Sequence, residues 1–134
     1  MSAPAWRFFA LGAVFAMIAV AAGAFGAHGL RARVDPAMLA VFETGARYQM
    51  YHALGLLAVA GAMAVAPGRL ASAAGWLFVA GILVFSGSLY ALVLTGIRSL
   101  GAVTPFGGLA FIAGWGCLAA WAVRGARKAR TRRT

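Results

Sequence analysis

FETGARYQMYH, residues Phe42 to His52, gathers an acid, a base, an amide, an imidazole and phenols within about three helical turns. It stands at the front of a long apolar run and contains Glu43, one of only two acidic residues among 134. Almost everything around it is apolar, so its position relative to the neighbouring runs decides how the chain is arranged. We interpret it as the cap of a four-helix membrane bundle.

The composition is that of a membrane protein. Hydrophobic residues make up 63% of the chain and charged residues 10%, with a mean hydropathy of +0.89, far outside the range of soluble globular proteins. A helix that crosses the bilayer core needs roughly 20 residues. The chain can therefore supply four spans, and no room is left for a soluble domain.

The formal charge of +10 does not indicate a nucleic-acid binder, because half of the basic residues lie in the last eleven positions, RGARKARTRRT. The others are scattered singly and form no basic face. We interpret the tail as a topology signal that also meets anionic lipid headgroups. The one cysteine, Cys117, lies in an apolar run and is interpreted as a small core residue.

Four apolar runs predict four helices in a single domain, residues 1–134. Asp35 followed by Pro36 is typical of a helix start, and Pro67 with Gly68 is typical of a stop. Pro105 stands where the start of the fourth helix tolerates it. The expected spans are about 8–28, 47–66, 70–97 and 102–123, followed by a basic cytoplasmic tail at 124–134.

The first run has an alternative interpretation as a secretory signal peptide, because Arg7 precedes it and small residues follow. The run is longer than the usual hydrophobic region of about 7 to 15 residues. In addition, Ala22 and Gly26 form a small-residue pair suited to close helix packing. We favour a membrane span.

Basic residues in short loops mark the cytoplasmic side of a membrane protein. An even number of spans puts both termini on one side, so the tail decides the orientation. Arg7, Arg69 and the tail then lie inside, and the remaining arginines (Arg31, Arg33, Arg47, Arg98) lie outside. The expected fold is all-α, a four-transmembrane-helix antiparallel bundle with both termini in the cytoplasm.

This topology brings polar side chains from all four helices into the non-cytoplasmic leaflet. Glu43 and Arg47 are four residues apart, so a salt bridge between them is expected. Gln49 and His52 point to another face of the same helix. We expect one of these two polar faces to meet His28 and the other to meet Tyr90 or Thr104. The candidate polar cluster is His28, Glu43, Arg47, Tyr48, Gln49, His52, Ser86, Ser88, Tyr90 and Thr104.

Structural and functional interpretations of this cluster both stay open. His28 and His52 suit a buried hydrogen bond between the first two helices, a proton relay or polar ligand site, or, with Glu43, a metal site. Ser86 and Ser88 suit hydroxyls bonded back to the preceding turn. No catalytic, cofactor-binding or metal-binding motif is present, so we expect no enzyme, no cofactor and no metal.

Four segments in order, GAFGAHGL, FETGARYQMYHALGLL, FSGSLYALVL and VTPFGGLAFIAGW, resemble the YgdD-like family of small membrane proteins, a domain of unknown function with eukaryotic transmembrane relatives. The resemblance covers about Phe8 to Trp121. It implies a four-helix multi-pass protein of the bacterial inner membrane and no established activity. It carries over the ten residues of the cluster together with Gly87, Pro105 and Gly107.

Small size, small-residue stripes and a compact polar cluster favour a non-enzymatic accessory, assembly or scaffold protein. Its partners would be another membrane protein or a second copy of the chain, with anionic lipid at the tail and no nucleic acid. The alternative is a small oligomeric transporter or ligand-binding membrane protein that uses the cluster. A closed polar network would favour the first function, and an unfilled polar pocket would favour the second.

Overall fold

The structure, a computed structural model, describes residues 1–132 and contains helices and short connections, with no strand in that part of the chain. Four helical spans are each long and apolar enough to cross a membrane: Ala3–Leu30, Pro36–Val65, Arg69–Thr95 and Arg98–Thr131. This confirms the all-helical class and the four expected apolar helices. Residues 133–134 of the expected basic tail lie outside the described part.

The four spans are built from eight elements. The first contains α1 (Ala3–Phe25) and the π-helical turn η1 (Gly26–Leu30), and the second is α2 (Pro36–Val65). The third contains α3 (Arg69–Gly81), the π-helical turn η2 (Ile82–Ser86) and α4 (Gly87–Thr95). The fourth contains the 3-10 turn η3 (Arg98–Ala102) and α5 (Thr104–Thr131).

Local chemistry sets the helix starts that the sequence predicted. The Asp35 carboxylate accepts a hydrogen bond from the Met38 backbone N–H at 3.0 Å, and Pro36 occupies the first helical position of α2. Pro105 likewise lies in the first turn of α5. A proline in the first turn costs no intrahelical hydrogen bond, because the first N–H groups of a helix have no partner within the helix.

The third span differs from the uninterrupted helix expected over about 70–97. The π-helical turn η2 interrupts it after Gly81, and the span ends at Thr95. Gly96 causes that end, since its φ of 74° lies in the left-handed region and cannot continue a right-handed helix. The basic segment also differs from a simple tail, because α5 continues through it to Thr131.

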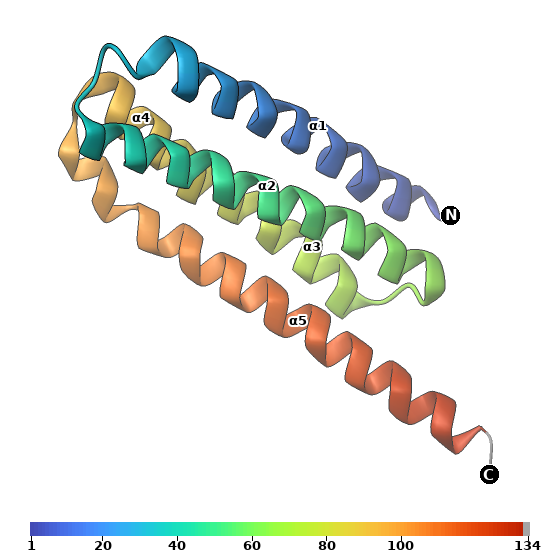
Figure 1. Ribbon diagram of the computed structural model, residues 1–134. Helices are drawn as coiled ribbons and strands as arrows, with labels where there is room; N and C mark the ends of the chain where they lie inside the picture. Colours follow the sequence, from blue (N-terminus) through green and yellow to red (C-terminus); the bar gives the residue numbers. More distant parts are fainter. Residues whose placement is uncertain (133–134) are drawn as a thin grey trace.

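The second and third spans form the centre of the molecule. In their most apolar windows 50% and 39% of residues are buried, against 17% in the first and in the fourth span. The first span packs mainly on α2, and α5 packs mainly on α3 and η2. The chain reverses direction at each connection between spans, so that both termini lie at one end (Figure 1).

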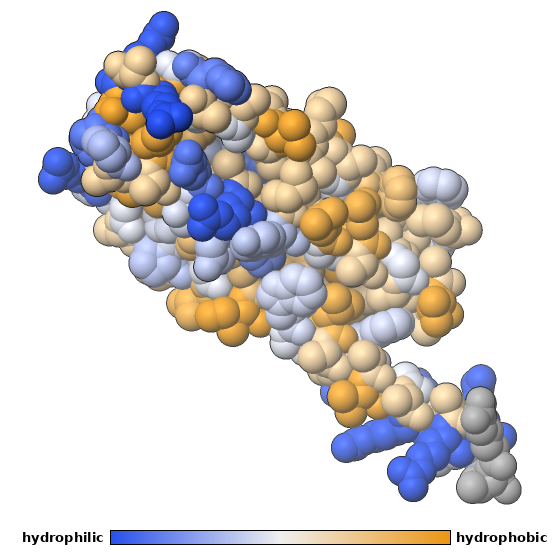
Figure 2. All heavy atoms as spheres, viewed as in Figure 1, coloured by the Kyte–Doolittle hydropathy of each residue, from blue (hydrophilic) through white to orange (hydrophobic). Residues whose placement is uncertain are grey.

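Two apolar clusters fill the interior. The larger lies toward the end that holds the termini and centres on Phe8, Leu56, Phe78 and Phe111. The smaller lies toward the opposite end and contains Leu30, Phe42, Leu92 and Val93. On the face shown in Figure 2, hydrophilic residues gather at that opposite end and on the protruding part of α5, and most of the surface between them is apolar.

Candidate functional site

Gln49 of α2 connects two other spans. Its side-chain amide donates to the Phe15 carbonyl of α1 at 2.9 Å, and its side-chain oxygen accepts from the Tyr90 hydroxyl of α4 at 2.9 Å. The amide is 3% exposed, so both bonds lie in an apolar environment. A buried amide left without partners would cost free energy. Gln49 thus fixes α2 to α1 and α4 together.

Ser86 makes a second bond between the central spans. Its hydroxyl donates to the Gly45 carbonyl of α2 at 2.7 Å, and the side chain is fully buried. Glycine at position 45 permits the close approach of the third span to α2, because a Cβ there would lie 3.0 Å from a Tyr90 ring carbon. The expectation that Ser86 bonds back to its own preceding turn was therefore wrong.

Ser88 and Thr104 join α4 to the start of α5. The Ser88 hydroxyl donates to the Phe85 carbonyl at 2.9 Å, as expected of a serine bonded to its preceding turn. A hydroxyl has only one proton to donate. The Thr104 hydroxyl, 2.7 Å away, is therefore the donor to Ser88.

His52 connects α2 to α5. The Trp115 indole N–H donates to Nε2 at 3.1 Å, and since an indole can only donate, Nε2 carries no proton. Nδ1 therefore carries it and donates to the Tyr48 carbonyl at 2.7 Å. The imidazole stacks on Phe111 with ring centroids 3.4 Å apart and planes inclined by 6°. Both ring nitrogens are occupied in the neutral form.

These bonds form one band of polar contacts between the two apolar clusters, and we call it the polar network: Gln49, His52, Ser86, Ser88, Tyr90, Thr104 and Trp115. It joins all four spans. Within the described residues no buried side-chain nitrogen or oxygen lacks a partner. The network is closed, and its chemistry is that of a structural connection.

Three members of the predicted cluster lie outside the network. His28, in η1, is exposed, and so are Glu43 and Arg47. Within residues 1–132 no ion pair of 4.0 Å or less joins Glu43 to Arg47, so the expected salt bridge was wrong. An exposed pair gains little free energy from contact, which removes the reason for the two side chains to meet.

The buried hydrogen bond between the first two helices, one of the alternatives for His28 and His52, is not formed, because His52 faces α5 and Gln49 makes the connection to α1. Tyr48 is 39% exposed and contributes its backbone carbonyl to the network. In the described part of the chain, no three His, Cys, Asp or Glu side chains are grouped as metal ligands.

Sequence reasoning missed three partners in the network. Two are backbone carbonyls, of Phe15 and Gly45, which no side-chain pattern reveals. The third is Trp115, whose position against His52 depends on the rotation of α5. The proline and glycines at the start of α5 predicted where the helix begins, but they did not predict its rotation about its own axis.

Beside the network, between α2 and α5, lies a hollow of about 530 Å³. Aromatic side chains form most of its wall, and His52 also lines it. It opens on the apolar side surface of the bundle. The lining residues are Tyr48, Tyr51, His52, Gly108, Phe111, Ile112 and Trp115.

Comparison with known proteins places the chain in a family. A family model described as "Protein of unknown function (DUF423)" matches residues 22–108. The chain belongs to the DUF423 family. The match contains every member of the predicted cluster, from His28 to Thr104, and excludes the basic extension of α5. This confirms a membrane family of unknown function, while the YgdD-like label itself stays a prediction.

Similar proteins occur in bacteria. The UPF0382 membrane protein YwdK of Bacillus subtilis (strain 168) is 52% identical over 109 residues, which cover 81% of this chain and 89% of the relative. UPF0382 membrane proteins of Staphylococcus aureus (strain bovine RF122 / ET3-1) and Staphylococcus haemolyticus (strain JCSC1435) are 52% and 50% identical over 108 residues, covering 81% of this chain and 88% of each relative. No solved structure matches the chain. With four apolar helices, the protein is an integral, multi-pass membrane protein.

Proposed function

We propose that this DUF423 protein acts by association, as a non-enzymatic accessory, assembly or scaffold protein of the bacterial inner membrane. The observation that carries the proposal is the closed polar network. Each buried side-chain nitrogen and oxygen of the network has a hydrogen-bond partner within the protein, on another side chain or on a backbone carbonyl. A network of this kind fixes the arrangement of the helices and leaves their outer surfaces available for contacts.

Those outer surfaces belong mainly to the peripheral spans. On α1, Met17 is 66% exposed, and on α5, Ile112 is 71% exposed. Each such face must be covered by lipid or by protein. A membrane-protein partner or a second copy of the chain would bind there, through packing of apolar side chains rather than through charge.

The proposed orientation is an antiparallel bundle with both termini in the cytoplasm. Arg7, Arg69 and the basic extension of α5 lie toward the end that holds the termini, and the rule that cytoplasmic loops are basic favours that side. The polar network then lies in the non-cytoplasmic half. The basic extension meets anionic headgroups on the cytoplasmic face.

Photocrosslinking in native membranes tests the proposal. A photoreactive amino acid would replace Met17 or Ile112, and the buried Val59 would serve as the control position. We expect discrete products heavier than the monomer from the two exposed positions and none from position 59. Monomer alone from all three positions would contradict association.

The second candidate function is a small oligomeric transporter or ligand-binding protein. The aromatic hollow beside His52 favours it, because stacked rings and phenol groups suit a flat, largely apolar ligand. Liposomes that contain wild type or His52→Ala test this function. A proton or solute flux above background that His52→Ala abolishes would support it, and equal background flux in both would remove it.

A further inference from the structure

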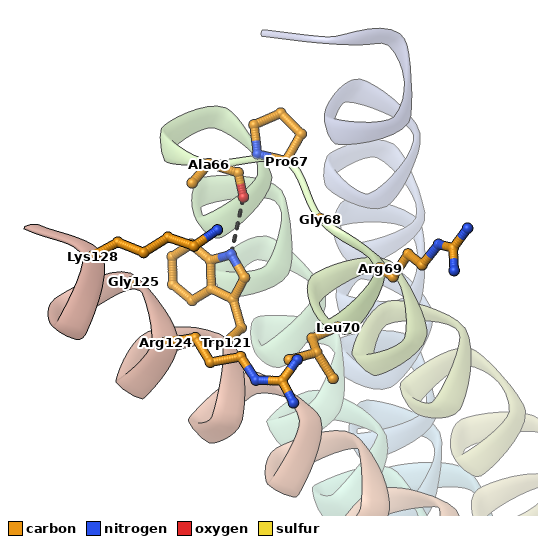
Figure 3. Close-up of a pocket in the computed structure, with 9 residues that line it drawn as sticks. All are labelled: Ala66, Pro67, Gly68, Arg69, Leu70, Trp121, Arg124, Gly125 and Lys128. Carbon is orange, nitrogen blue, oxygen red and sulfur yellow. Dashed lines mark hydrogen bonds between the residues drawn. The ribbon is translucent and has the colours of Figure 1, made fainter.

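A cleft of about 230 Å³ lies between the turn that connects α2 to α3 and the outer part of α5 (Figure 3). Ala66, Pro67 and Gly68 form one wall, and Trp121, Arg124 and Lys128 form the other. The cleft is at the end of the molecule that holds the termini, opposite the polar network. It therefore lies where the apolar surface of the spans gives way to the basic extension.

Trp121 holds the two walls of the cleft together. Its indole N–H donates to the Ala66 carbonyl at 2.9 Å, the dashed contact in Figure 3. Tryptophan concentrates at the level of lipid headgroups, where its ring meets the apolar region and its N–H meets polar groups. A tryptophan at this end of the spans therefore favours a position of the cleft at the level of the lipid headgroups.

The charges around the cleft are all positive. Arg124 and Lys128 follow Trp121 by three and seven residues, so they share its face of α5. In Figure 3 their side chains extend on either side of the indole, and the Lys128 amino group lies on the side of the Ala66 carbonyl. Within the described residues neither cation has an ion-pair partner. Both acids of the chain, Asp35 and Glu43, belong to the opposite end.

The opposite wall adds further positive potential. It contains the first turn of α3, which has no capping side chain and no acidic residue. Free N–H groups at a helix start favour a nearby anion. Arg69 also borders the cleft, but its side chain is directed away in Figure 3, which leaves Arg124 and Lys128 as the cations beside the indole.

An apolar hollow of about 620 Å³ adjoins the cleft and shares Trp121 and Lys128 with it. Its other lining residues are mostly apolar (Val65, Ala122, Ala126 and Ala129), with Arg132 at its border. A charged cleft beside an apolar hollow fits a ligand with an anionic head and a hydrocarbon body. A free inorganic anion would use only the first of the two.

We propose that Arg124 and Lys128 bind the phosphate of one anionic phospholipid, with its glycerol and upper acyl carbons against Trp121 and the adjoining hollow. The inference rests on the membrane placement proposed above, but not on association with a protein partner. Binding of one lipid by two named side chains is more specific than the general attraction of a basic segment to a negative surface. It assigns the contact to two of the basic residues of the extension.

The chain offers a matched pair of variants for the test. Arg124→Gln with Lys128→Gln removes two charges that line the cleft, whereas Arg127→Gln with Arg130→Gln removes two charges from the same helix outside it. All four side chains are exposed, so both variants should fold. Far-UV circular dichroism and the melting temperature of each purified variant check this.

Native mass spectrometry of the purified protein, titrated with phosphatidylglycerol or phosphatidylcholine, measures the binding. We expect one phosphatidylglycerol bound in preference to phosphatidylcholine by wild type and by the Arg127/Arg130 variant. We expect about tenfold weaker binding by the Arg124/Lys128 variant. Equal weakening in both variants would mean a diffuse electrostatic attraction and would overturn the site.

A competition arm separates a lipid from a soluble anion. Inorganic phosphate or glycerol phosphate at millimolar concentration should leave the phosphatidylglycerol complex intact. Displacement by either one would show a site for a soluble phosphate and would overturn the lipid assignment. Because these measurements use purified protein without a partner, their failure would leave the proposed association untouched.

Discussion

At the scale of single residues, Gln49 illustrates how the network works. One side chain uses its donor toward α1 and its acceptor toward α4, so both ends of the amide are satisfied. Hydrogen bonds between membrane helices average about 0.6 kcal/mol and reach about 1.7 kcal/mol. Two such bonds on one buried side chain make Gln49 costly to replace.

Gln49→Leu should lower the free energy of unfolding by about 1 to 3 kcal/mol, because it removes both bonds and leaves the Tyr90 hydroxyl without its acceptor. Unfolding in mixed micelles, followed by circular dichroism, measures the change. Thr44→Ala is the control, since that hydroxyl bonds only the Ala40 carbonyl of its own helix. An equal effect of the two substitutions would refute the bridging role of Gln49.

His52 should be a single neutral tautomer with its proton on Nδ1. The reason is that Trp115 donates to Nε2, which a protonated Nε2 could not accept. Nitrogen-15 NMR of histidine-labelled protein distinguishes the tautomers. Trp115→Phe removes the indole donor and should allow a second tautomer to appear. A charged imidazole, or a proton on Nε2 in wild type, would disprove the assignment.

The contacts of single side chains could be predicted only in part, because their partners lie on other helices or in solvent. Tyr90 was one of two partners considered for a polar face of α2, and it bonds Gln49. The prediction of a salt bridge between Glu43 and Arg47 was wrong. A spacing of four residues allows such a bridge, but at an exposed position the bridge gains little free energy.

At the scale of elements, the starts of α2 and α5 followed from local chemistry, because a capping aspartate and a proline act within one turn. The π-helical turn η2 could not be predicted in this way. It lies where α5 packs closely on the third span, with Gly107 against the backbone of Phe85. Such a turn depends on contacts between helices, and propensities along one helix do not contain that information.

Two glycines of α5 give a matched test of this packing. A Cβ on Gly107 would overlap the Phe85 backbone, whereas a Cβ on Gly116 would have no neighbour within 4 Å. Gly107→Ala should therefore destabilise the fold by about 1 to 3 kcal/mol. Gly116→Ala should be neutral or stabilise it by up to about 1 kcal/mol, because alanine favours the helix.

The same unfolding measurement in mixed micelles compares the two variants. Both substitutions add one methyl group to the same helix, so general effects on helix propensity cancel in the comparison. Similar stabilities for the two variants would show that α5 does not pack on η2 as described.

At the scale of the whole molecule, the two ends differ in chemistry. The polar network and both acids lie toward one end, and the cationic cleft lies at the other. Composition and hydropathy alone predicted the four apolar helices, because span length and apolar content are properties of the sequence. The central position of α2 and the peripheral position of α1 and α5 required the contacts themselves.

The orientation of the four spans decides on which side of the membrane the polar network and the lipid site lie. Single cysteines in a Cys117→Ala background test it most directly. Ser2→Cys reports the end that holds the termini, and Ser99→Cys reports the connection before α5; both serines are exposed.

The measurement is labelling of spheroplasts with a membrane-impermeant maleimide, before and after lysis. With both termini in the cytoplasm, cysteine at position 99 should react in intact spheroplasts, and cysteine at position 2 should react only after lysis. Reaction at position 2 in intact spheroplasts, with or without reaction at position 99, would contradict this orientation.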